Sequence, residues 1–180
     1  TQMLLKNADI AMYQAKEYGR NNFKFFHEQM HADLMQYHEL ERDIREAINL
    51  GQFHLAYQPK VNVRINQLQG LEALLRWNSP TRGNVSPADF IPVAEESGHI
   101  IPLGYWVLNE VCLTLKSWQD KGLTLVPVSV NVSARQFQQP DFHKRVAEVL
   151  RRHGVDPSLI EIELTEGLVR GDKHQVLLGI

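Results

Sequence analysis

Three segments of the chain, residues 71–77, 126–133 and 160–165, alternate apolar and polar side chains with a period of two. This period is typical of β-strands, because successive side chains point to opposite faces. One face of each segment is apolar and rich in Val, Leu or Ile. The opposite faces carry Glu72 and Arg76, then Ser129, Asn131 and Ser133, then Glu161, Glu163 and Thr165. Polar groups in buried strands are costly unless they are paired or bind a ligand, so these faces predict one shared site.

Strands and helices alternate along most of the chain. Apolar spacing and stop signals predict helices over residues 4–18, 32–50, 87–97, 102–120 and 140–153, with another beginning after Asp172. Strands are predicted over residues 23–26, 53–61, 67–77, 125–132 and 158–165. We expect Pro59 to end the strand that begins at residue 53. This alternation favours parallel pairing with right-handed crossovers, so the predicted fold class is α/β.

Composition limits the classes of function. The chain has 180 residues, of which 43% are hydrophobic and 22% charged, as in ordinary globular domains. The formal net charge of −2 argues against a basic surface that binds duplex nucleic acid. No leader and no run of 18 apolar residues is present, so we expect no membrane contact from this segment. The single Cys112 allows no internal disulfide and indicates a reducing, cytoplasmic location, while a membrane anchor upstream in the parent protein stays open.

Simple structural roles compete with the site hypothesis. Glu72 and Arg76 share a strand face and could form a structural ion pair. Glu161 is expected to be a solvated acid, whereas Glu163 is assigned to the site. Lys60, next to Pro59, is expected to be an exposed lysine at the end of a strand, and contact with a phosphate group is the alternative.

Several motifs resemble those of one bacterial family. The run from Glu72 to Trp77, Glu-Ala-Leu-Leu-Arg-Trp, is similar to the signature of the EAL family, which hydrolyses the second messenger cyclic di-GMP. Similar motifs follow the order of that family, and they are Tyr57–Lys60, Asp89–Gly98, Val130–Phe137 and Glu163–Glu166. The segment Ala8–Lys16 with Gly19–Asn21 resembles the final helix of a GGDEF domain, the diguanylate cyclase module.

The resemblance implies a domain plan. Residues 1–26 would be the end of a GGDEF domain, residues 27–50 a linker and first helix, and residues 51–180 the first half of an EAL domain. That domain is a (β/α)8 barrel of the TIM type, of which about four of the eight strands would lie in this chain. The expected fold is therefore an incomplete barrel, preceded by a helix-strand remnant and a linker helix.

The resemblance also implies roles for individual residues. Glu72, Asn131 and Glu163 would be metal ligands, and the two glutamates would be catalytic in this sense. Arg76, Gln58 and Leu74 would contact the substrate, while Glu166 would support a nearby loop. Oxygen ligands suit Mg²⁺ or Mn²⁺, two of which would act in the complete domain.

The function implied is metal-dependent hydrolysis of cyclic di-GMP to linear pGpG. The family's later aspartate pair, lysine, glutamate and glutamine are not in this sequence, so we expect little turnover from these 180 residues alone. Two alternatives stay open: a cyclic di-GMP receptor that keeps the fold without catalysis, and an interaction module. Homodimerisation is also compatible with the family.

Overall fold

The computed structural model describes residues 2–17 and 23–164, with the backbone alone for residues 2 and 13–17. The chain divides into two compact units, Thr1–Ile44 and Arg45–Ile180. The predicted domain limits at residues 26 and 50 stay predictions. No helix in the described ranges is long and apolar enough to cross a bilayer.

The first unit is helical. It contains α1 (Gln2–Glu17) and the first part of α2 (Glu28–Asn49). Ile10, Ala11 and Met30 form its small buried core. The strand predicted over residues 23–26 is wrong, because this segment has no regular structure and pairs with no strand in the described part of the chain. Its phenylalanines at positions 23 and 25 are 77% and 80% exposed.

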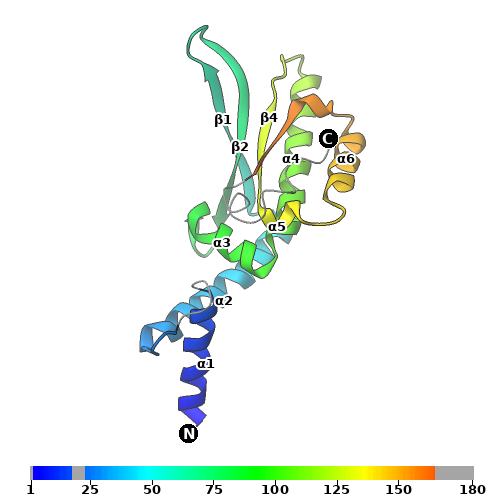
Figure 1. Ribbon diagram of the computed structural model, residues 1–180. Helices are drawn as coiled ribbons and strands as arrows, with labels where there is room; N and C mark the ends of the chain where they lie inside the picture. The colour runs from blue at the N-terminus through cyan, green and yellow to red at the C-terminus, as the bar shows by residue number, and fades with distance from the viewer. Residues whose placement is uncertain (1, 18–22, 165–180) are drawn as a thin grey trace. The chain divides into compact units, whose positions relative to one another are not determined.

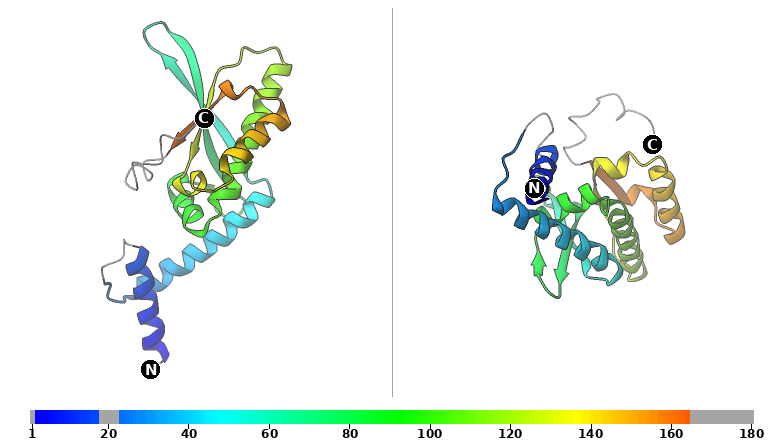
Figure 2. Two further views of the ribbon diagram at one scale, coloured as in Figure 1. Left: turned by 45° about the vertical axis from the view of Figure 1, so that its right-hand side comes forward. Right: turned by 90° about the horizontal axis from the view of Figure 1, so that it is seen from below.

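A mixed sheet forms the centre of the second unit. Its strands are β1 (Phe53–Asn62), β2 (Gln67–Ser79), β3 (Gly83–Val85), β4 (Val128–Val132) and β5 (Ile160–Leu164). The order is β1-β2-β4-β5, with β3 paired to β2. β2, β4 and β5 are parallel, as the alternation predicted. Figures 1 and 2 show the long β1–β2 hairpin beside β4.

The pairing of β1 was not predicted correctly, because β1 runs antiparallel to β2. Only residues 63–66 connect the two strands. A parallel crossover needs a dozen or more residues, so this short loop permits a hairpin alone. Pro59 does not end β1, which continues to Asn62. Proline is tolerated there because β1 is an edge strand of the described sheet, where an absent N–H leaves no ladder bond unmade.

Helices cover one face of the sheet. They are α3 (Pro87–Ser97), α4 (Ile100–Asp120), the short α5 (Ala134–Phe137) and α6 (Phe142–His153), followed by a 3₁₀ turn at Pro157–Leu159. The α/β fold class is thereby confirmed. α5, β3 and the 3₁₀ turn were not predicted, since each has only three or four residues and too little sequence for a period to appear.

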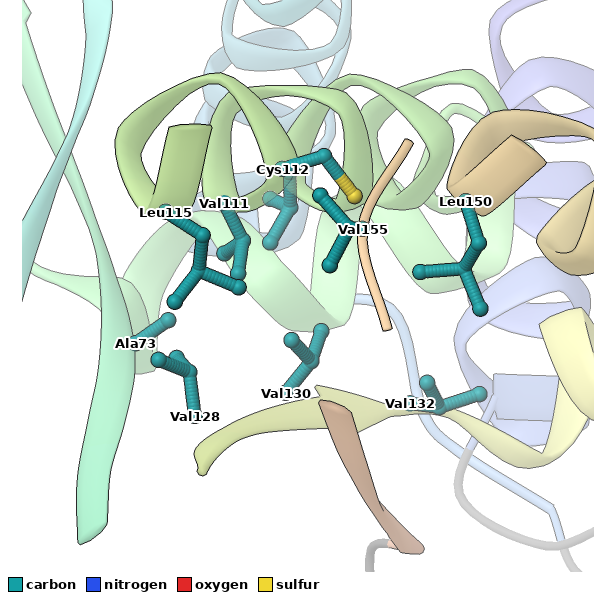
Figure 3. Packing of buried hydrophobic residues seen from close by; sticks show 10 residues of the cluster. Ala73, Val111, Cys112, Leu115, Val128, Val130, Val132, Leu150 and Val155 are labelled. Carbon is teal, nitrogen blue, oxygen red and sulfur yellow. The ribbon is translucent and has the colours of Figure 1, made fainter. Parts of the chain in front are cut away.

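The apolar strand faces form the core with α4 and α6. Val128, Val130 and Val132 are at most 3% exposed and face α4, as Figure 3 shows. Their partners on α4 recur at every fourth residue, the helical spacing of a buried face, and include Val107, Val111 and Leu115. Cys112 belongs to this core, and burial raises the pKa of its thiol to about 11. This thiol therefore stays protonated at neutral pH and serves packing.

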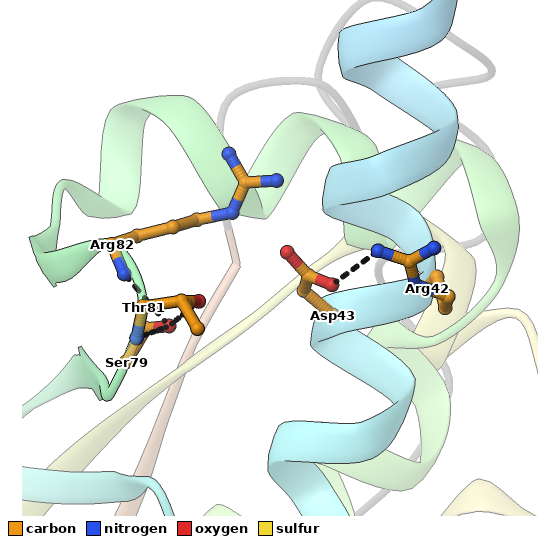
Figure 4. A network of polar contacts seen from close by, with 5 residues as sticks. All are labelled: Arg42, Asp43, Ser79, Thr81 and Arg82. Atoms are coloured by element: carbon orange, nitrogen blue, oxygen red, sulfur yellow. Dashed lines mark hydrogen bonds and ion pairs between the residues drawn. The ribbon is translucent and has the colours of Figure 1, made fainter.

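Aromatic rings and a tight turn close the far end of β2. The rings of Phe53 and Trp77 lie 5.4 Å apart, and those of Trp77 and Phe90 lie 5.5 Å apart. In the turn that leads to β3, Ser79 Oγ accepts hydrogen bonds from the backbone N–H groups of Thr81 and Arg82, at 3.4 and 3.3 Å. Figure 4 shows this turn, together with the pair of Arg42 and Asp43 on α2. Trp77 is a packing residue and is 1% exposed.

A polar corner fixes the end of β4. Ser133 and Gln136 form a capping box at the start of α5, in which Gln136 Oε1 accepts from Ser133 N at 2.9 Å. Arg135 Nη1 donates to the carbonyl oxygens of Glu95 and Glu96 at the end of α3, the latter at 2.7 Å. The buried Gln136 side chain also packs against Gly104, where a Cβ atom would lie 1.6 Å from Nε2.

This corner predicts a destabilising effect of Gly104→Ala. Alanine is the better helix former by about 1 kcal/mol, so propensity alone would stabilise α4. The new methyl group would instead displace Gln136 from its capping box, and we expect a net loss of about 1–3 kcal/mol in the free energy of unfolding. Urea unfolding measures the change. Gln119→Ala on the exposed side of the same helix is the control, expected within about 0.5 kcal/mol of wild type. An unchanged or higher stability of Gly104→Ala would contradict the packing described.

Candidate metal and nucleotide site

The polar faces of β2, β4 and β5 lie side by side, opposite the helix-covered face. Glu72 pairs in register with Ser129, and Ser129 with Glu161. Two residues further along β4 and β5, Asn131 pairs with Glu163. The three residues predicted as metal ligands, Glu72, Asn131 and Glu163, are thus brought together from three adjacent strands.

A hydrogen bond joins the first two of these residues. Asn131 Nδ2 donates to Glu72 Oε1 at 2.8 Å. This contact orients the Glu72 carboxylate and uses the nitrogen end of the amide. It leaves the carboxamide oxygen of Asn131 as the atom offered to a ligand.

Lys60 reaches the same face from β1. Its ammonium group donates to Ser129 Oγ at 2.6 Å and to Glu163 Oε1. Ser129 Oγ in turn donates to Glu161 Oε2 at 2.7 Å, so Glu161 is exposed, as expected, but also hydrogen-bonded. The prediction of Lys60 as a solvated strand-end lysine is wrong. It failed because β1 continues beyond Pro59, and because the contact to Glu163 spans 103 residues and leaves no local signal.

The contact between Lys60 and Glu163 shifts the pKa values of both groups. The hydrogen bond to Glu163 raises the pKa of Lys60, and the Glu161 and Glu72 carboxylates raise it further. The Lys60 ammonium lowers the pKa of the Glu163 carboxyl group in return. Both side chains are partly exposed, at 36% and 42%, so solvent screens the pair.

The residues predicted to contact substrate lie around these acids. Gln58 is exposed on β1, in register with Glu72. Leu74 and Arg76 follow Glu72 on the same face of β2, towards the end of the strand. Arg76 Nη1 donates to the Leu75 carbonyl oxygen at 2.9 Å. Within the described residues it forms no ion pair with Glu72, so the structural pairing considered from the sequence does not occur.

The donor set fits a hard divalent cation. Two carboxylates and one carboxamide oxygen are ligands that Mg²⁺ and Mn²⁺ prefer, and no sulfur donor is among them. In the described part of the chain no three His, Cys, Asp or Glu side chains cluster closely enough to hold an ion. The predicted donor set differs from such a cluster in that its third member is the carboxamide oxygen of Asn131. Glu166, predicted to support a loop, lies outside the described residues.

Comparisons with known proteins identify the family of the chain. A family model described as EAL domain matches residues 41–178. The chain is 40% identical over 175 residues to the bifunctional diguanylate cyclase/cyclic di-GMP phosphodiesterase MucR of Pseudomonas aeruginosa. It is 41% identical over 171 residues to the cyclic di-GMP phosphodiesterase PdeR of Escherichia coli. These matches cover 97% and 94% of this chain but only 26% of each relative.

Solved structures show the same fold. The PaMucR phosphodiesterase in complex with c-di-GMP superposes with a TM-score of 0.70 at 39% identity, covering 74% of this chain and 54% of the other. The EAL enzyme Bd1971 in its cGMP-bound form gives a TM-score of 0.70 at 34% identity, with coverages of 77% and 39%.

The Lys60 contact predicts a titration effect. Because Glu163 has a lowered pKa, its ion pair stabilises the fold above the ordinary glutamate pKa of about 4.3, and this contribution is lost as pH falls through the lowered value. Lys60→Met should raise the Glu163 pKa towards the ordinary value. Carboxyl ¹³C NMR of labelled glutamate measures it. Lys116→Met, which removes an exposed lysine of α4, should leave Glu163 unchanged. A Glu163 titration that is the same in Lys60→Met and wild type would refute the contact.

Proposed function

Because the chain belongs to the EAL domain family, we propose that the full-length protein hydrolyses cyclic di-GMP to the linear dinucleotide pGpG with divalent metal ions. The observation that carries the proposal is the convergence of Glu72, Asn131 and Glu163 on one face of three adjacent strands. MucR and PdeR, both named as cyclic di-GMP phosphodiesterases, support the choice of substrate. The chain spans about a quarter of these relatives, so the activity is proposed for the whole protein.

In this proposal the acids and the amide hold the ions. Glu72 and Glu163 contribute carboxylate oxygens, and Asn131 contributes its carboxamide oxygen while its nitrogen keeps Glu72 oriented. Bound Mg²⁺ or Mn²⁺ would supply Lewis-acid activation of water and of the phosphodiester group. Two ions would act in the complete domain, as in other two-metal phosphodiesterases.

The remaining site residues position the substrate. Arg76 carries a guanidinium group that suits a phosphodiester, because its fork of N–H donors matches two phosphate oxygens. Its contact with the Leu75 carbonyl uses only part of these donors. Gln58 and Leu74 flank Glu72 and would contact the nucleotide, one by hydrogen bonds and the other by apolar packing.

The first test replaces a proposed metal ligand. Glu72→Gln keeps the size of the side chain but removes its charge, so we expect kcat for cyclic di-GMP hydrolysis with Mn²⁺ to fall by roughly 100-fold or more. Chromatography of pGpG formed by the full-length protein measures it. Glu148→Gln is the matched control, since Glu148 lies on α6 and pairs with Arg152. It should retain wild-type turnover.

The same experiment distinguishes a phosphodiesterase from a receptor that only binds cyclic di-GMP. A receptor would bind cyclic di-GMP without producing pGpG, and its affinity would not depend on Glu72. Wild-type protein that binds the nucleotide but does not turn it over with either ion would therefore replace the phosphodiesterase with the receptor alternative.

The second test concerns the phosphate contact. Arg76→Ala should raise KM for cyclic di-GMP by about 10-fold or more, because a charged hydrogen bond to substrate is lost. Ion affinity should stay close to wild type, since Arg76 is not a proposed ligand. Arg151→Ala, which alters an exposed arginine of α6, controls for loss of net charge. A lowered kcat with an unchanged KM would argue against a role in ground-state binding.

A further inference from the structure

Lys60 is a cation of this site to which the proposed function gives no role. It lies on β1, outside the three strands that carry the proposed ligands, yet its ammonium contacts Glu163 on β5 and Ser129 on β4. To do so the side chain must cross β2. Its register partner there is Gly70, which has no side chain to stand in the way.

Gly70 is closely packed against Pro127, the residue that precedes β4. A Cβ atom at Gly70 would come within 3.0 Å of the Pro127 carbonyl oxygen, so a larger residue would meet backbone that cannot easily move. Glycine is therefore the residue that this position of β2 accommodates, and at this level of the sheet β2 places no side chain between Lys60 and the strands beyond it.

Lys60 also has a central place in the charge distribution. Glu163 accepts its hydrogen bond, Glu161 is linked to it through Ser129, and the Glu72 charge acts on it from β2. The other cation on this face, Arg76, is hydrogen-bonded to the Leu75 carbonyl oxygen. Lys60 is therefore positioned to neutralise the carboxylates when no divalent ion is bound.

We propose that the Lys60 ammonium is the internal counter-ion of the ion-free site and competes with the divalent ion for Glu163. This inference rests on the proposed ion site. The carboxylate oxygen that accepts from Lys60 is one that an ion would take, and a positive charge beside a divalent ion repels it. The flexible lysine stem allows the ammonium to move aside when the ion enters.

The proposal predicts the sign of an affinity change. Removing the ammonium should make Mn²⁺ bind more tightly, by roughly 3-fold to 10-fold for a partly screened charge. A lysine that merely oriented Glu163 for the ion would give the opposite result, because its loss would weaken binding. Lys60 therefore differs from an ordinary positioning residue in a measurable way.

The experiment measures Mn²⁺ binding without substrate. Full-length wild type, Lys60→Met and the exposed control Lys116→Met are titrated with Mn²⁺ and followed by electron paramagnetic resonance of the free ion. We expect tighter binding in Lys60→Met and no change in Lys116→Met. Lys60→Gln provides a second neutral variant if the methionine variant folds poorly, and Lys60→Arg should stay near wild type because it keeps the charge.

A double variant identifies the group through which Lys60 acts. In the Glu163→Gln background, Lys60→Met should increase affinity by much less, because the competed carboxylate is absent and only the repulsion between the ammonium and the ion is relieved. Thermal unfolding gives an independent measure. Without ions Lys60→Met should melt at a lower temperature than wild type, and saturating Mn²⁺ should raise its melting temperature by more.

Different results would contradict the role of Lys60 and the proposed ion site. Unchanged or weaker Mn²⁺ binding in both neutral variants would overturn the role of Lys60 alone. Wild-type protein whose Mn²⁺ binding is absent, or is insensitive to Glu72→Gln, would overturn the ion site and this inference together.

Discussion

The register between β2, β4 and β5 is the constraint on which both fold and site depend. Val128, Val130 and Val132 are buried under α4, which turns Ser129 and Asn131 to the opposite face. A slip of one residue would exchange the two faces, placing the amide in the apolar core and the valines in the site. The free energy of burying the valines, about 1.5–3 kcal/mol for each side chain, therefore also orients the proposed ligands. Stability and site geometry have the same physical origin here.

Hydrogen bonds within the chain support each acid of the polar face. Three carboxylates on neighbouring strands would repel one another, since adjacent strands lie only about 4.8 Å apart. Each has its own donor: Glu72 accepts from Asn131, Glu161 from Ser129 and Glu163 from Lys60. One donor for each acid lowers the cost of holding the charges together and leaves other oxygen lone pairs open to a ligand. Such an arrangement explains how the fold tolerates an acidic face within its sheet.

Part of this picture could be predicted from the sequence. A period of two identified the parallel strands and the shared face of Glu72, Asn131 and Glu163, because strand geometry makes this information local. Lys60 could not be assigned in this way, since its partner lies 103 residues away and only the folded sheet brings them together. The wrong strand at residues 23–26 has a related cause: aromatic residues favour strands, but a strand also needs a partner. The antiparallel direction of β1 could be predicted from its short loop, because a parallel crossover needs a dozen or more residues.

That direction determines what β1 contributes to the site. In the hairpin, the side chains of Gln58 and Lys60 share a face and lie opposite Glu72 and Gly70. The first is therefore level with an acid of β2, whereas the second lies over a glycine and can extend past it to Ser129. A glutamine beside the acid can reach a nucleotide, whereas the lysine beside the glycine contacts Ser129 and Glu163 on the strands beyond β2. Two residues only two positions apart thus acquire different roles, and the difference arises from the β2 residue that each one faces.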